Sequence, residues 1–183
     1  MVSKAQHGCI DCLALMICAE LQTADSSKEF SMSKTNKTEN VPTANSVLNH
    51  VIQQLIQDRS DHGLEKPVLL SFRLCMANVI ISACQKISNP RKKRLAKKIV
   101  PVLINSAAVI TNSDVRAACI QVLFSAVYHL KLAILSYSSD LLRLSIKALE
   151  EGSDMVCMIL PHGIWLLIGF ISLFLGNEGK NKA

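Results

Sequence analysis

One apolar pattern occurs three times in this chain, and its spacing restricts the folds that the chain can adopt. Each copy has a Cys, an apolar neighbour, a branched aliphatic residue four positions after the Cys and a small or aliphatic residue eight positions after it. The residues are Cys9, Ile10, Leu13 and Ile17; Cys75, Met76, Val79 and Ala83; and Cys119, Ile120, Leu123 and Val127. Intervals of four and eight place side chains on one helix face. The last two copies start 44 residues apart, an interval typical of stacked helical arrays.

The composition agrees with an all-helical fold. Of the 183 residues, 50% are apolar and only 4% are aromatic, which favours helices built from Leu, Ile, Val and Ala over a β-sandwich. The seven cysteines are an odd number and lie within apolar stretches. That arrangement is typical of reduced thiols in a reducing compartment and not of a disulfide framework.

Composition divides the chain into four segments. Residues 1–22 carry apolar positions at helical spacing and are interpreted as an incomplete N-terminal repeat helix. Residues 23–46 are rich in Ser, Thr, Lys, Asn and Glu, cannot bury enough apolar area to offset their ordering entropy, and are predicted to be a flexible linker. Residues 47–154 are predicted to be helical repeats, and residues 155–183 form a hydrophobic C-terminal segment.

Polar caps and prolines place the boundaries of the helices within the repeat segment. The expected helices are 47–58, 68–87 with Pro67 in the first turn, 88–110, 115–131 after a cap at 111–114, and 141–151 after a Ser-Ser-Asp cap at 138–140. Pro101 leaves two alternatives for the third of these, two short helices or one kinked helix.

Two of these helices resemble units of armadillo and HEAT repeat proteins. Residues 113–118 (S-D-V-R-A-A), which lead into an Ile-x-x-Leu pattern, resemble the inner helix of a unit, and residues 141–149 resemble the outer helix of the next. The 44-residue interval lies within the period of about 40 to 47 residues of these repeats. The resemblance implies a short superhelical stack of about two and a half units, which binds extended partners along one surface without chemistry of its own.

The sequence contains no Walker loop, no G-x-S-x-G, no G-x-G-x-x-G after a strand and no H-E-x-x-H. Together with the resemblance, this predicts a non-enzymatic scaffold or adaptor without a cofactor, located in the cytoplasm or nucleus. We expect a protein partner to bind to exposed positions of the helices 68–87 and 115–131.

Basic residues are concentrated in one run, which consists of Arg91, Lys92, Lys93, Arg94, Lys97 and Lys98. The other 14 basic residues balance the 14 acidic ones, so the net charge of +6 is local. The run matches the pattern that nuclear import receptors bind, and it can also contact phosphates. The alternative is a solvated first part of a helix. No aromatic residue is interleaved for base stacking, which argues against nucleic acid.

His7, Cys9 and Cys12 have the spacing of half a metal site. A full zinc site needs four ligands, and the other cysteines lie far away in sequence. On a helix, both cysteines fall on the side of Leu13 and Ile17, so core packing is the preferred interpretation. Asp11 lies inside the same apolar run and argues against a signal peptide.

The C-terminal segment is apolar on all sides of the expected helix. Its most apolar residues are Ile164, Trp165, Leu166, Leu167, Ile168, Phe170, Ile171, Leu173, Phe174 and Leu175. One alternative is a membrane helix over about 158–176, which would make this a tail-anchored protein whose helical region faces the cytosol. Pro161 shortens the apolar run, so a buried helix of one more repeat, or a dimer contact, is a further alternative. A truncated product of a longer armadillo-repeat protein also fits the pattern.

Overall fold

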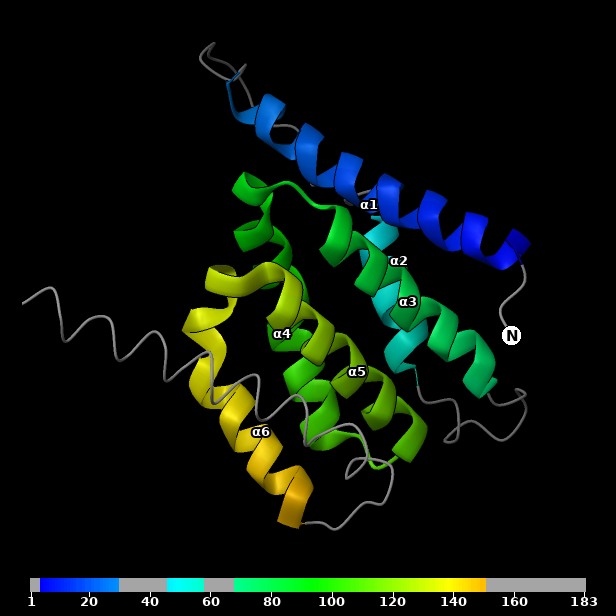
Figure 1. Cartoon of the computed structure of the whole chain (residues 1–183), viewed down its shortest axis with the longest axis vertical. Coiled ribbons are helices and arrows are strands. Elements are labelled where there is room, and N and C mark those ends of the chain that lie inside the picture. The colour runs from blue at the N-terminus through cyan, green and yellow to red at the C-terminus, as the bar shows by residue number, and fades with distance from the viewer. Residues whose placement is uncertain (1–3, 30–45, 58–67, 151–183) are drawn as a thin grey trace, which may run out of the picture.

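The computed structural model describes residues 4–29, 46–57 and 68–150, and the regular structure in these ranges is helical throughout (Figure 1). The predicted all-α fold class is therefore confirmed. The elements are α1 (Lys4–Glu29), α2 (Val47–Ile56), α3 (Leu70–Lys86), α4 (Asn89–Val109), α5 (Ser113–Leu130), the 3-10 helix η1 (Lys131–Tyr137) and α6 (Ser138–Glu150).

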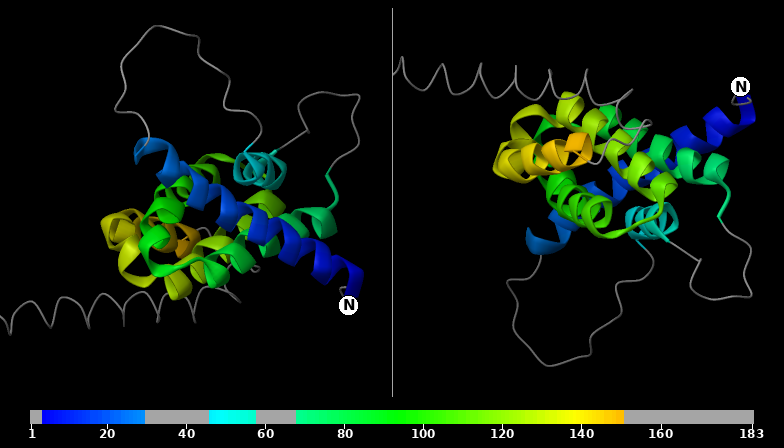
Figure 2. Two further views of the ribbon diagram at one scale, coloured as in Figure 1. Left: turned by 90° about the horizontal axis from the view of Figure 1, so that it is seen from above. Right: turned by 90° about the horizontal axis from the view of Figure 1, so that it is seen from below.

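The helices form two layers. Helices α1, α3 and α5 lie side by side and run in the same direction, with α3 in contact with both of the others (Figure 1). Helices α2 and α4 lie on one side of this layer and run in the opposite direction (Figure 2). The three copies of the Cys pattern are on α1, α3 and α5, so the sequence repeat marks the helices of one layer.

One apolar core joins both layers. The residue eight positions after the Cys is buried in all three copies of the pattern, as Ile17, Ala83 and Val127. The opposite layer contributes Leu48 and Leu55 from α2 and a larger set from α4. That set is Leu95, Ala96, Ile99, Val100, Leu103 and Ala107. The helices bury their apolar side chains against one another, and α5 is buried on most of its sides, so the contacts between helices stabilise the stack.

Helix α1 is longer than the sequence indicates. It continues through residues 23–29, which the composition places in the flexible linker. Adding residues to a helix that is already nucleated and packed costs little per residue, and Ala24, Lys28 and Glu29 are good helix formers. Packing of the first turns therefore extends the helix beyond its apolar pattern.

Several boundaries differ from the expected ones. Helix α3 begins at Leu70 and not at 68, and Pro67 lies outside the described residues. Helix α4 is a single helix that contains Pro101, which decides between the two alternatives for this segment. The sequence predicts a cap at residues 138–140, but these residues belong to α6, and η1 leads directly into α6 at Ser138.

The structure contradicts the core-packing interpretation of Cys9 and Cys12. Both thiols are exposed, although Cys18 on the same helix is buried. The buried side of α1 is centred on Ala14, Ile17 and Leu21. Among the described residues, α1 has a neighbour in its own layer on one side only, so the side chains that face away from α3 are exposed there.

Candidate protein-docking face and basic pocket

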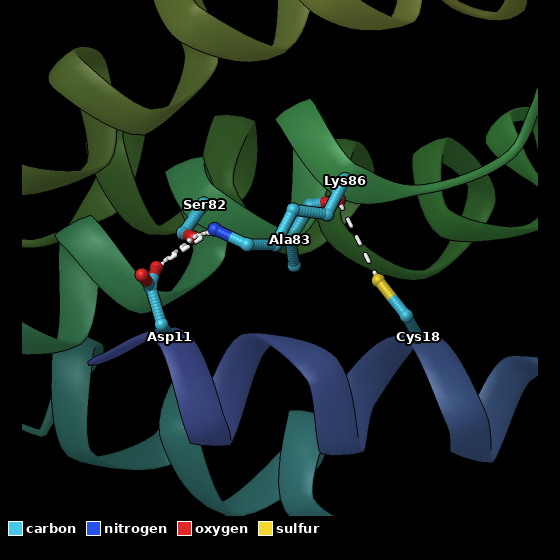
Figure 3. Close-up of polar contacts among 5 residues, drawn as sticks. All are labelled: Asp11, Cys18, Ser82, Ala83 and Lys86. Atoms are coloured by element: carbon cyan, nitrogen blue, oxygen red, sulfur yellow. Dashed lines mark hydrogen bonds and ion pairs between the residues drawn. The ribbon is translucent and has the colours of Figure 1, made fainter. Parts of the chain in front are cut away.

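Helices α1 and α3 are joined by a small polar cluster at their contact (Figure 3). The hydroxyl of Ser82 donates to Asp11 Oδ1 at 3.0 Å, and Lys86 Nζ donates to the same oxygen at 2.7 Å. Lys86 Nζ also lies 2.9 Å from Ser82 Oγ. The hydrogen bond from Lys86, followed by that from Ser82, lowers the pKa of the Asp11 carboxyl from its ordinary value of 3.8. The cluster holds the two helices in register.

Arg73 is the most buried charged side chain in the described ranges, with 3% of its surface exposed. Its guanidinium donates to the carbonyl of Leu55 and, through Nη2 at 3.2 Å, to the carbonyl of Gln57. These carbonyls lie at the C-terminal end of α2, where backbone acceptors lack helical partners and a cation is favoured. Arg73 therefore links α3 to the end of α2. In the sequence, Arg73 is a basic residue four positions before Ala77, which places it on the apolar face of α3 and could have indicated that it is buried.

Solvent-accessible side chains recur at intervals of seven residues on α3 and on α5. On α3, these side chains are Ser71, Asn78 and Gln85, and on α5 they are Gln121 and Tyr128. An interval of seven keeps residues on nearly the same side of a helix. These five residues are called the ladder face. They are exposed or half-buried and carry no formal charge, and Tyr128 is 61% exposed.

The structure separates the six residues of the basic run. Arg94 Nη1 donates to the carbonyl of Leu21 on α1 at 2.9 Å, and Lys98 Nζ lies 3.8 Å from a carboxylate oxygen of Glu20. Glu20 in turn accepts hydrogen bonds from Ser46 Oγ and, at 3.4 Å, from the backbone amide of Leu48 at the start of α2. Two residues of the run therefore help to hold α1, α2 and α4 together.

Lys92 and Lys93 face a different region, a pocket of about 410 Å³ between the start of α4 and η1. The pocket is lined by Asn89, Lys92, Lys93, Leu130, Lys131, Leu132 and Ala133. Lys131 adds a third ammonium group from outside the run, and the sequence pattern does not indicate it. Exposed Lys97 is not among the lining residues, and Arg91 donates to Ser88 Oγ at 3.0 Å. We call this hollow the basic pocket.

A second pocket, of about 510 Å³, lies between α4 and α6. Ile104 and Ala108 line it from α4, and Asp140, Arg143 and Lys147 line it from α6. Arg143 pairs with Asp140 one turn away on α6, and Lys147 donates to the carbonyl of Ala108 at 3.2 Å. Its charged groups therefore have partners within the protein.

Burial disfavours the reactive thiolate form of the buried cysteines. Burial raises the pKa of Cys84 and of Cys119 to about 12, and it also raises the pKa of Cys18. The Cys18 thiol lies 3.8 Å from the carbonyl of Ala83, across the contact between α1 and α3 (Figure 3). In the described part of the chain, no three His, Cys, Asp or Glu side chains are gathered closely enough to hold a metal ion.

The hydrophobic C-terminal residues 164–175 lie outside the described residues, so the membrane helix stays a prediction. Within the described ranges, the helical stretch Ser113–Lys147 is long and apolar enough to cross a membrane by length and composition alone. Half of its most apolar window is buried inside the protein, which is also typical of a core helix in a soluble protein.

Comparison with known proteins identifies no matching family model, no curated protein and no solved structure with significant similarity to this chain. The resemblance to armadillo and HEAT repeats therefore rests on the sequence pattern. The all-helical architecture is compatible with it.

Proposed function

We propose that this protein is a non-enzymatic helical scaffold, and that a protein partner binds along the ladder face. The observation that carries the proposal is the arrangement of α3 and α5. These helices lie side by side and run in the same direction, and each presents residues at intervals of seven to solvent. A partner that lies across the two helices would contact accessible side chains of both, although the α3 residues that correspond to Gln121 and Tyr128 in the repeat, Ala77 and Cys84, are buried.

The chemistry of the ladder face supports this proposal. Asn78, Gln85 and Gln121 have side-chain amides, which offer both a donor and an acceptor and can pair with the peptide groups of a partner. Tyr128 adds an exposed aromatic ring with a hydroxyl, a combination enriched at protein interfaces. The lack of formal charge on these five residues favours a partner whose contacts are made through its backbone and apolar side chains.

The rigidity of α3 also supports a docking role for this face. Arg73 links α3 to the end of α2, and the cluster of Asp11, Ser82 and Lys86 links it to α1. A surface that is held in place before binding loses less conformational entropy when a partner binds. The ladder face therefore has the preorganisation that a docking surface needs.

A site-specific cross-linking experiment tests the proposal. A photoreactive phenylalanine analogue in place of Tyr128 samples the ladder face, and the same analogue in place of Val102, which is exposed on α4, is the matched control. We expect partners to be cross-linked in cells through position 128 and not through position 102. In the position-128 protein, the double substitution Asn78→Arg and Gln121→Arg should remove these products.

Thermal unfolding must show that the double variant keeps the melting temperature of its parent. If positions 128 and 102 give the same products, or if the folded double variant retains them, the ladder face is not the docking surface.

A further inference from the structure

We propose that the basic pocket binds the phosphate group of a phosphorylated side chain in a protein partner. The pocket shares no residue with the ladder face, so this proposal goes beyond the scaffold function, and either one can fail without the other. The inference depends on the charges around the pocket, its size and the apolar surface at its edge.

Three lysines line the pocket, and none of them pairs with an acidic group among the described residues. Lys92 and Lys93 come from the first turns of α4, and Lys131 comes from the start of η1. Within the described ranges, these three side chains form no hydrogen bond and no ion pair. By contrast, Arg94 and Lys98 of the same run bind groups of α1. The pocket is thus a concentration of positive charge that the described part of the chain leaves uncompensated.

A phosphate monoester matches this charge. It carries about −1.5 to −2 charges at pH 7 and three strong acceptor oxygens, whereas a carboxylate carries a single charge. The pocket lies beside Asn89 at the N-terminal end of α4, whose dipole favours an anion, and beside Leu130 at the C-terminal end of α5, whose dipole opposes it, so the lysines supply the attraction. Asn89 contributes a neutral amide that can donate to a further oxygen.

The shape and the remaining lining residues favour a peptide as the bearer of the phosphate. A volume of about 410 Å³ is within the range of sites for small ligands, and it exceeds what one phosphate group fills. The rest of the lining is aliphatic, through Leu130, Leu132 and Ala133, and Leu132 is 59% exposed. A neighbouring apolar side chain of a peptide can pack there. Among the described residues, no aromatic ring lines the pocket for a base to stack on. A concave site also suits one protruding group better than a flat membrane surface does.

His129 provides an internal reporter for the pocket. Burial lowers the pKa of its imidazole, and the positive charges of Lys92 and Lys131 lower it further. An anion bound between those two lysines would offset their charge and raise the pKa of His129. Salt also screens these charges, so a titration with sodium chloride at the same ionic strength serves as the control. A rise in the pKa of His129 beyond that control indicates an anion bound in the pocket.

Lys131 also permits a variant that separates binding from folding. Its backbone has a φ of 50°, a value that glycine adopts without strain and other residues rarely adopt. The substitution Lys131→Gly therefore removes an ammonium group from the pocket and relieves the backbone at the same position. A lower affinity in this variant cannot be attributed to unfolding if its melting temperature is unchanged or higher.

The experiment uses the full chain, and its probe is a short peptide with one phosphoserine flanked by Leu. The unphosphorylated peptide, a vesicle containing phosphatidylserine and an oligothymidine serve as comparisons. Affinity is measured by calorimetry at pH 7.5, and the pKa of His129 is measured by NMR with and without the phosphopeptide. The variants are Lys131→Gly and Lys92→Gln, with Lys97→Gln as the control of equal charge change outside the pocket.

We expect the phosphopeptide to bind the wild-type protein and to raise the pKa of His129. Each pocket variant should weaken binding roughly tenfold, as expected for loss of one charge-assisted hydrogen bond, and Lys97→Gln should change it less than about twofold. Equal weakening by all three variants would show diffuse attraction and overturn the proposal. The proposal is also overturned if the phosphopeptide does not bind, or if only the vesicle or the oligothymidine binds in a Lys131-dependent way.

Discussion

The Nζ atom of Lys86 lies 2.7 Å from Asp11 Oδ1 and joins two parallel helices across 75 positions of sequence. Asp11 is the charge that interrupts the first apolar run of the chain. In the folded protein, this carboxylate accepts hydrogen bonds from Lys86 and Ser82, so it contributes to the packing of α1 on α3. We therefore expect the stability contributed by this contact to depend on pH.

The stability contributed by Asp11 should disappear in acid. Its pKa is lowered in the folded protein, chiefly by the hydrogen bond from Lys86, whereas the unfolded chain has the ordinary value of 3.8. The folded state therefore binds this proton less readily. The contribution is fully present above about pH 5 and is lost as the pH falls through 3.8 and then through the folded pKa.

The measurement is the difference in melting temperature between the wild-type protein and Asp11→Asn, followed from pH 7 into acid. We expect a small positive difference at pH 7, because the carboxylate is exposed to solvent, and none below the folded pKa. In a Lys86→Met background, the difference should be much smaller at every pH. A difference that stays constant over the whole range would contradict this assignment.

Replacing Arg73 should destabilise the protein more than replacing a surface arginine. The variant Arg73→Met keeps the apolar stem but leaves the carbonyls of Leu55 and Gln57 without their charged donor. A hydrogen bond to a charged group contributes about 1.5–3 kcal/mol, so a loss of about that size is expected in urea denaturation. The matched control is Arg143→Met, whose side chain is 79% exposed and whose loss should change stability by less than about 1 kcal/mol. Equal effects of the two substitutions would refute the role assigned to Arg73.

The thiols should fall into two reactivity classes. Cys9 and Cys12 are exposed and should react with a thiol reagent in the native protein. Cys84 and Cys119 are buried, and their raised pKa of about 12 keeps the thiolate fraction negligible at pH 8. They should react only after the chain is unfolded. Mass spectrometry of alkylated peptides, taken at successive times, assigns each cysteine to one of the two classes. Rapid labelling of Cys84 in the native state would contradict the packing of α3.

Lys131→Gly should stabilise the protein, whereas Lys131→Ala should not. The φ of 50° at this position places the side chain in a region that is unfavourable for residues with a Cβ atom. Relief of the strain is expected to contribute about 1 kcal/mol and to exceed the entropic cost of a glycine in the unfolded chain. Equilibrium unfolding in urea distinguishes the two variants. A loss of stability in Lys131→Gly equal to that in Lys131→Ala would show that the backbone here is not strained.

The membrane prediction depends on residues outside the described ranges and needs a separate test. If residues 164–175 cross a membrane, the full chain should resist carbonate extraction, and a chain that lacks 155–183 should become soluble. If they form a buried helix or a dimer contact, both chains should be extracted. A full chain that carbonate releases completely would exclude the anchor.

The local pattern of the sequence is sufficient to predict an all-helical chain and the approximate positions of the described helices. This is because the spacing of apolar residues depends only on the period of the helix. Asn112 illustrates the same point at a helix end, since its side chain caps α5 by accepting from the amides of Asp114 and Val115. Such interactions span a few residues and are encoded by consecutive positions.

The tertiary structure decided which residues meet across the helices. Cys9 and Cys119 begin the same pattern, yet Cys9 is exposed and Cys119 is buried, because α5 has neighbours in both layers and the outer side of α1 has none among the described residues. The contiguous basic run was likewise divided, with Arg94 bound to α1 and Lys92 placed in a pocket beside Lys131. A helical period determines the face on which a side chain lies. Whether that face meets solvent, another helix or a second charge depends on contacts between residues that are distant in sequence, and the linear pattern does not record those contacts.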